Sequence, residues 1–184
     1  MAVSIEWSKT KQFSKTLSRT RVHTRYKNAA GKVVPGTTTA LGVIAKPALS
    51  HWAWKQGIEG LDYKKVRDKA GDIGTLSHYL IESHIKGIEP EIGDFTPNDL
   101  ERANHAFNRY LEWEELYQIK PLASELKLVS EHYQYGGTID LIASGIGGKV
   151  ILPDFKTSNG IYKEMHYQVA AYKQLVEECT KWNP

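Results

Sequence analysis

Two acids and a lysine in the second half of the chain form a group of residues that can do chemistry. Asp154 and Lys156 are two residues apart in KVILPDFK, and Asp140 closes the motif GTID on the preceding predicted strand. Side chains two apart on a β-strand point to the same face, so Asp154 and Lys156 face the same way while Phe155 points into the core. Carboxylates on adjacent strands repel each other, and a hard divalent cation relieves that repulsion.

Pro153 and Lys156 extend this chemistry. Because Pro153 cannot donate a hydrogen bond to a sheet, its strand lies at an edge or is distorted, and distortion frees a backbone carbonyl as a further ligand. Lys156 can hold an attacking water or neutralise the charge that develops on a phosphate. Together these groups predict a Mg²⁺ site for phosphodiester hydrolysis. The alternative is a surface hairpin with solvated charges, because an isolated D-x-K is common.

Residues on predicted helices can complete the site. Gln168 and Tyr172 are four apart in QVAAY and therefore share one helical face. A glutamine can orient the lysine or bind a phosphate, and a tyrosine can stack on a base or pack on the sheet. His78 lies in GTLSHYLIESH, where a lone histidine is more often structural or exposed than functional.

The elements that must position these residues follow from periodicity and cap signals. Helices are predicted over residues 47–60, 72–85, 97–117 and 161–178, with Thr96 capping the third. Segments of period two predict strands over residues 124–130, 137–143 and 149–155, and a short hairpin around 28–34. This order predicts an α/β layered domain. Three strands make a small sheet, so one or two further strands, trimmed or supplied elsewhere, are expected.

Composition sets limits on the function. The chain has 184 residues, a size that suits one soluble domain, and its net charge is +3. Its single cysteine, Cys179, excludes a disulfide framework and cysteine-held zinc or iron–sulfur sites, which favours a cytoplasmic location. No apolar run is long enough for a membrane helix, and the N-terminus lacks a secretion signal. Residues 8–33 hold basic side chains without an acid, which suits either a phosphate backbone or a solvated terminus.

Four motifs occur in an order that is typical of one enzyme family. They are G-T-x-x-H at 74–78, G-T-I-D at 137–140, D-F-K at 154–156 and Q-x-x-x-Y at 168–172. Together they resemble the RecB-like branch of the PD-(D/E)XK nuclease superfamily. The stretch PGTTTALGVIAKPALSHWAWKQG also resembles the single-strand exonucleases similar to the mitochondrial genome maintenance exonuclease.

The resemblance implies a fold and a domain organisation. The fold would be α/β with a restriction-endonuclease-like core, a small central mixed β-sheet flanked by helices, and an N-terminal helical region. Residues 1–184 would form a single nuclease domain. In it, residues 1–70 would receive DNA, and residues 71–184 would be the catalytic core, truncated at its C-terminal end.

The resemblance also implies roles for the matching residues. The implied catalytic residues are Asp140, Asp154, Lys156, His78, Gln168 and Tyr172. The implied metal ligands are His78, Asp140, Asp154 and the Phe155 carbonyl. Glu125, in SELKLVS, is either an outer ligand or an ordinary strand charge.

The expected function is therefore a Mg²⁺- or Mn²⁺-dependent deoxyribonuclease. The family implies an exonuclease on single-stranded DNA or DNA ends, in the cytoplasm of a bacterial or phage-infected cell, with recombination or replication proteins as candidate partners. The sequence lacks a G-x-x-x-x-G-K-[ST] loop, so no ATP-driven motor is expected. The alternative is a non-catalytic nucleic-acid-binding module that retains the nuclease fold. Competent residues at all the candidate positions favour the enzyme.

Overall fold

The structure is a computed structural model that describes residues 24–44 and 46–184. Most of the basic N-terminal block, from Lys9 to Arg21, lies outside these residues. The helices are α1 (Thr37–Leu41), α2 (Pro47–Ile58), α3 (Tyr63–Lys86), α4 (Pro97–Leu116) and α5 (Lys163–Cys179). The strands are β1 (Tyr26–Lys27), β2 (Val33–Val34), β3 (Lys120–Ser130), β4 (Tyr135–Ser144) and β5 (Val150–Ile151), with a 3-10 turn η1 (Ile146–Gly148) before β5.

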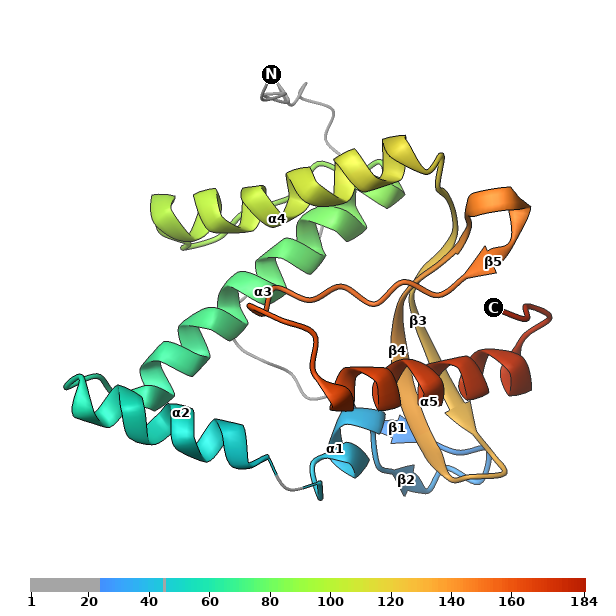
Figure 1. The fold of residues 1–184 in the computed structure, drawn as a ribbon. Helices are drawn as coiled ribbons and strands as arrows, with labels where there is room; N and C mark the ends of the chain where they lie inside the picture. Colours follow the sequence, from blue (N-terminus) through green and yellow to red (C-terminus); the bar gives the residue numbers. More distant parts are fainter. Residues whose placement is uncertain (1–23, 45) are drawn as a thin grey trace.

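The fold is α/β, as predicted, with a three-stranded sheet in the order β3-β4-β5 (Figure 1). α5 crosses the lower half of β3 and β4, and α1 contacts α5 beneath it. α3 and α4 pack against each other beside the upper half of the sheet. The hairpin of β1 and β2 contacts β4 at its lower end.

The expectation of a mixed sheet is wrong for the described residues. β3 pairs antiparallel with β4, β4 pairs antiparallel with β5, and β1 pairs antiparallel with β2. Within residues 24–44 and 46–184, parallel pairing is limited to one isolated bridge between Gly36 and Gly136. The reason is the length of the connections, since short turns join antiparallel strands whereas parallel neighbours need a long crossover.

The third strand of the sheet is shorter than the sequence predicts. Pairing of β5 with β4 ends at Ile151, opposite Ala143, whereas the strand was expected to reach Phe155. Continuing this register would place Asp154 directly opposite Asp140, and like charges in that position are destabilising. Pro153 also removes a donor from the ladder. The segment therefore leaves the sheet before it reaches the candidate site.

The ends of the long helices follow from their caps. The Asp62 side chain accepts hydrogen bonds from the backbone of Lys64 and Lys65 and starts α3, and Gly87 ends this helix with a positive φ of 63°. The predicted start at residue 72 is wrong, because residues 63–71 are almost all exposed and carry little apolar periodicity. At α4, the Thr96 hydroxyl accepts from the Asp99 backbone N–H, as predicted.

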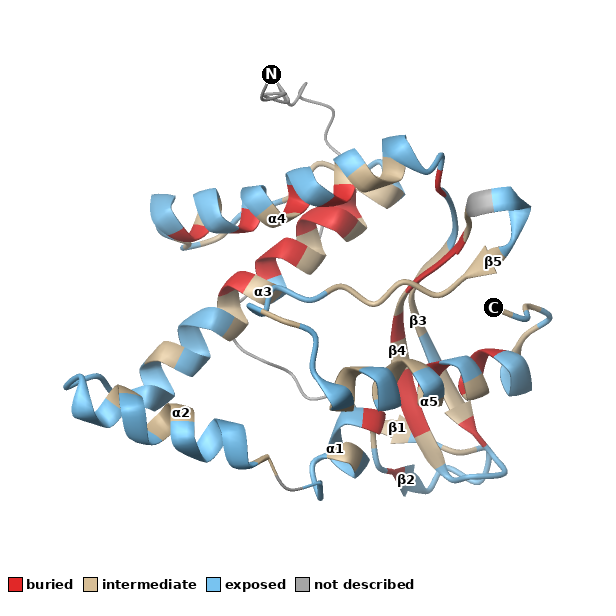
Figure 2. Ribbon diagram, in the orientation of Figure 1, coloured by how far each residue is buried: buried red, intermediate tan, exposed pale blue. Residues whose placement is uncertain are grey.

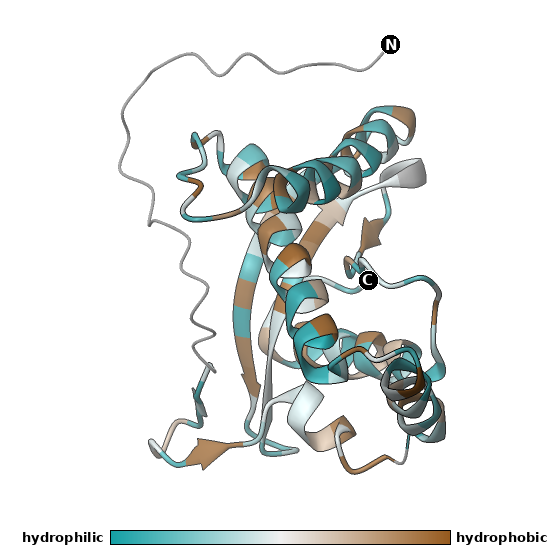
Figure 3. Cartoon of the chain, turned by 90° about the vertical axis from the view of Figure 1, so that its left-hand side faces the viewer, coloured by the Kyte–Doolittle hydropathy of each residue, from teal (hydrophilic) through white to brown (hydrophobic). Residues whose placement is uncertain are grey.

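Two apolar clusters form the core, and both use residues of β4 (Figure 2). One joins α3 and α4 to Leu141 and Ala143, and the other joins α5 to Ile139 and Ile142. Hydrophilic and hydrophobic residues are interleaved along the helices, as in helices that bury one face (Figure 3). In the described ranges, no helix has an apolar stretch long enough to cross a membrane.

Candidate metal centre

Three side chains from three elements converge beside the first core cluster. His78 comes from α3, Glu125 from β3 and Asp140 from β4, and each offers one ligand atom within 4.8 Å of the others. The β3–β4 register flanks Glu125 and Asp140 with the pairs Ser124–Leu141 and Leu126–Ile139, which places the two acids opposite each other. Antiparallel pairing therefore brings the two carboxylates together, and α3 adds the imidazole.

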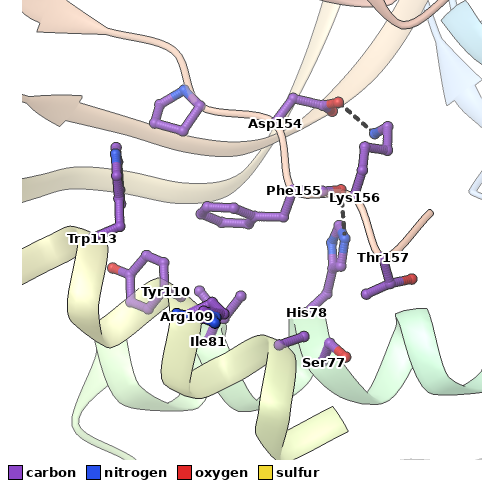
Figure 4. Close-up of a pocket in the computed structure, with 12 residues that line it drawn as sticks. Ser77, His78, Ile81, Arg109, Tyr110, Trp113, Asp154, Phe155, Lys156 and Thr157 are labelled. Carbon is purple, nitrogen blue, oxygen red and sulfur yellow. Dashed lines mark hydrogen bonds and ion pairs between the residues drawn. The ribbon is translucent and has the colours of Figure 1, made fainter. Parts of the chain in front are cut away.

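His78 is held by the segment that follows β5 and by β4. Its Nε2 donates to the carbonyl oxygen of Phe155 at 3.0 Å (Figure 4). Its Nδ1 lies 3.7 Å from Asp140 Oδ1. The Phe155 backbone N–H donates to Asp140 Oδ2 at 2.9 Å. The Asp140 carboxylate thus accepts the hydrogen bond that a backbone carbonyl of a neighbouring strand would accept in a regular sheet. This bond holds residues 154–156 at the site.

Glu125 occupies an unusual backbone position and an unfavourable electrostatic one. Its φ is 50°, which is uncommon for a residue with a side chain and is found disproportionately at functional sites. Burial raises the pKa of its carboxyl group to about 7, and the charges of Asp140 and Glu82 add to this effect. The ionised form of Glu125 is therefore costly unless a cation compensates it.

Asp140 experiences the same kind of crowding. Burial raises the pKa of its carboxyl group, and the nearby charge of Asp154 raises it further. His78, the Phe155 N–H and Lys156 act in the opposite direction. Two crowded carboxylates and an imidazole make a donor set that suits a hard divalent ion, since carboxylates favour Mg²⁺ and Mn²⁺ and imidazole is accepted by Mn²⁺.

Asp154 lies next to this cluster and is held by other partners. Its side chain is only 4% exposed and forms an ion pair with Lys156, whose side chain is 30% exposed. Gln168 Nε2 donates to Asp154 Oδ1 at 3.2 Å and to the Tyr172 hydroxyl at 3.0 Å. The predicted shared orientation of Asp154 and Lys156 is confirmed, although neither residue is on a strand.

Tyr172 belongs to the core. Its ring is buried in the second cluster, and burial raises the pKa of its hydroxyl group. A Cβ added at Gly137 would lie 2.7 Å from the ring, so the glycine of the GTID motif makes room for α5 on β4. Of the two sequence alternatives for Tyr172, packing on the sheet is the one found here, with its hydroxyl group orienting Gln168.

The structure therefore brings the predicted residues into one region but divides them into two sets. His78 and Asp140 lie in the three-residue cluster, the Phe155 carbonyl contacts His78, and Asp154, Lys156, Gln168 and Tyr172 form a hydrogen-bonded chain beside it. Glu125, which the sequence left open, completes the cluster. Sequence reasoning assigned no role to Glu82, although its position four residues after His78 on one helical face was the available signal.

Comparison with known proteins adds no assignment. No family model matches the sequence, and no curated protein matches it. The function must therefore be argued from the chemistry of the site.

Proposed function

We propose that this chain is a divalent-metal-dependent DNA nuclease that hydrolyses phosphodiester bonds, as an exonuclease on single strands or DNA ends. The observation that carries the proposal is the convergence of His78, Glu125 and Asp140 within 4.8 Å, beside the ion pair of Asp154 and Lys156. We further propose that its α/β fold is a restriction-endonuclease-like core of the RecB-like PD-(D/E)XK branch. The antiparallel hairpin that carries Asp140 and the segment that carries Asp154 and Lys156 support this assignment.

The donor set is suited to Mg²⁺ or Mn²⁺, and Glu125, Asp140 and His78 would hold the ion. When bound, such a cation stabilises the negative charge that develops on a phosphate under attack. A bound cation would offset the repulsion among the neighbouring carboxylates, which adds to the effect of burial in raising the pKa values of Asp140 and Glu125. Glu82, whose charge acts on Glu125, strengthens the negative potential at the site.

The second set of residues would act on the substrate. Lys156, 30% exposed, can donate to a phosphate oxygen or orient a water for attack. Asp154 holds the ammonium group of Lys156 by their ion pair, and Gln168 fixes Asp154 through one hydrogen bond while it is itself held by Tyr172. Gln168 and Tyr172 would be positioning residues. Residues 71–184 would be the catalytic core, and residues 1–70 would contact DNA.

The test is an assay on end-labelled single- and double-stranded DNA in Mg²⁺, Mn²⁺ or EDTA. We expect metal-dependent degradation, and a loss of about 100-fold or more in rate in Asp140→Asn and Lys156→Ala, since each removes a group that stabilises the transition state. Lys149→Ala is the matched control. This lysine is exposed at the β4–β5 turn, so its loss should leave the rate within about twofold of the wild type.

Three results separate the alternatives. Unchanged cleavage in Asp140→Asn or Lys156→Ala would contradict the mechanism. Binding of DNA without cleavage in any metal would instead favour the non-catalytic module. Resistance of a circular single strand would distinguish an exonuclease from an endonuclease.

A further inference from the structure

A cavity of about 410 Å³ opens beside the candidate metal centre, between α3, α4 and residues 153–157 (Figure 4). Its volume lies within the range of about 300–1,000 Å³ that is usual for small-molecule sites. The residues that line it include Arg109, Tyr110, Trp113, Phe155, Lys156 and Thr157. Lys156 connects this cavity to the proposed nuclease site.

One end of the cavity is aromatic. Trp113 and Tyr110, on α4, have ring centroids 6.0 Å apart, and the Tyr110 and Phe155 rings form a T-shaped pair with centroids 5.3 Å apart. Trp113 is only partly buried, so part of its ring is accessible. Aromatic side chains of this kind accept a nucleobase by stacking, without regard to which base it is.

The other end of the cavity is polar. Lys156 and Thr157 line it from the loop side and His78 from α3, on the opposite side from Trp113 (Figure 4). The Thr157 hydroxyl comes close to α3 at Gly74, where an added Cβ would lie 3.1 Å from it. The Lys156 ammonium group pairs with Asp154, which also lines the cavity, and it can donate to a phosphate together with the Thr157 hydroxyl group.

Arg109 provides an exposed cation at the rim. Its side chain is 70% exposed and pairs with Glu112, which is itself 64% exposed. An exposed pair of this kind contributes little to stability, so the guanidinium group can exchange Glu112 for an anionic ligand at small cost. The planar guanidinium group suits a phosphate or the face of a base.

We propose that this cavity receives the terminal nucleotide of a DNA strand, with its base between the Trp113 ring, which packs on Tyr110, and the guanidinium group of Arg109, and with its phosphate toward Lys156 and Thr157. The proposal rests on the nuclease function proposed above and specifies which part of the substrate the site recognises. An aromatic wall, a polar end beside Lys156 and a volume suited to one small ligand together match a nucleotide better than they match a duplex.

Binding can be tested separately from cleavage. Short single strands with an internal fluorescent label are titrated with protein in EDTA, and anisotropy reports affinity. One strand is intact, one lacks the base of its 5′ nucleotide, one lacks the base of its 3′ nucleotide, and one lacks an internal base. We expect the wild type to lose about fivefold or more in affinity for one of the two end-modified strands, because a stacked base is lost there.

The variants locate this discrimination. Trp113→Ala and Arg109→Ala should bind the intact and the sensitive end-modified strand with nearly equal affinity, whereas Trp113→Phe should still discriminate between them. Arg102→Ala is the matched control, since Arg102 is exposed on the same helix and does not line the cavity. Thermal melting verifies folding, and Arg109→Ala decides the matter if Trp113→Ala does not fold.

The outcomes separate this inference from the nuclease proposal. Equal affinity of the wild type for all four strands would overturn the cavity assignment, even if metal-dependent cleavage is observed. Discrimination that persists in Arg109→Ala and Trp113→Ala would also overturn it, because the end would then be bound elsewhere. A wild type that neither binds nor cleaves any strand would overturn both proposals.

Discussion

The carboxyl group of Glu125 lies near those of Asp140 and Glu82, and burial with these charges raises its pKa from 4.5 to about 7. Between these two values the folded protein keeps a proton that the unfolded chain releases, so the free energy of unfolding falls as the pH rises through this window. Above it the cost stays constant. A neutral side chain of the same shape should remove this cost.

We therefore expect Glu125→Gln to stabilise the metal-free protein by about 2 kcal/mol near pH 8 and to change it little near pH 5. Urea unfolding in EDTA at the two pH values measures the difference. Glu101→Gln is the matched control, since Glu101 is exposed on α4 and should show no such pH dependence. An equal pH slope in the wild type and in Glu125→Gln would mean that Glu125 ionises normally.

The sequence predicted some residues of the candidate site but could not decide the role of Glu125, and both outcomes have a physical reason. Asp140, Lys156 and His78 stand out because their types and their order along the chain carry the chemistry. Glu125 could not be decided, because its place in the cluster depends on a φ of 50° and on a register shift between Pro121 and Ala123. Neither of these backbone features is visible in the alternation of SELKLVS.

At the scale of elements, α5 can approach β4 because Gly137 has no side chain. An added Cβ would lie 2.7 Å from the Tyr172 ring and 2.9 Å from Leu175, both of which are buried. We expect Gly137→Ala to destabilise the protein by about 1–3 kcal/mol, the usual cost of overpacking a core. Urea unfolding monitored by far-UV circular dichroism measures the change.

Gly57→Ala is the matched control for this substitution. Gly57 lies in α2, and nothing lies within 4 Å of a Cβ added there. Alanine has the higher helix propensity, so this variant should be neutral or more stable by up to about 1 kcal/mol. If Gly137→Ala were as stable as Gly57→Ala, the contact between α5 and β4 would not be as tight as the structure has it.

The elements themselves were largely predictable where local signals are strong. Pro47, Thr96 with Pro97, and Gly87 mark helix ends at which the sequence and the structure agree. The sequence did not predict the first turns of α3, because an exposed helix segment has no apolar stripe. The only local signal for this helix start is the N-cap residue Asp62. The strand that follows Lys149 is shorter than predicted. The apolar run in the sequence does not reveal that continued pairing with β4 would place Asp154 opposite Asp140.

At the scale of the whole molecule, the candidate site lies where the two core clusters meet. α3, which supplies His78, packs in the first cluster, and α5, which supplies Gln168 and Tyr172, packs in the second. Asp140 is on β4, which contributes to both clusters, and Glu125 is on its neighbour β3. A cation held by His78, Glu125 and Asp140 would therefore link α3 directly to both long strands. It would bind only the folded chain, because the three ligands come together only on folding.

Such a cation must raise the stability of the folded state through mass action. At a concentration about 100 times its dissociation constant, an ion that binds only the folded chain contributes about 2.7 kcal/mol. For a chain of this size that corresponds to a rise in Tm of roughly 5–10 °C. We expect Mn²⁺ to raise the Tm of the wild type by this amount relative to EDTA, as measured by differential scanning calorimetry.

The comparison that matters is the shift within each variant, because removing a crowded acid also changes the stability of the metal-free protein. Asp140→Asn keeps an oxygen that can accept the Phe155 N–H but loses the charge, so its Tm should rise much less with Mn²⁺. Glu101→Gln should respond as the wild type does. If the Tm of Asp140→Asn rose with Mn²⁺ as much as that of the wild type, the ion would bind elsewhere. The nuclease mechanism would then lose its cation. The same aspartate belongs to the metal cluster and accepts the hydrogen bond that holds the segment carrying Lys156.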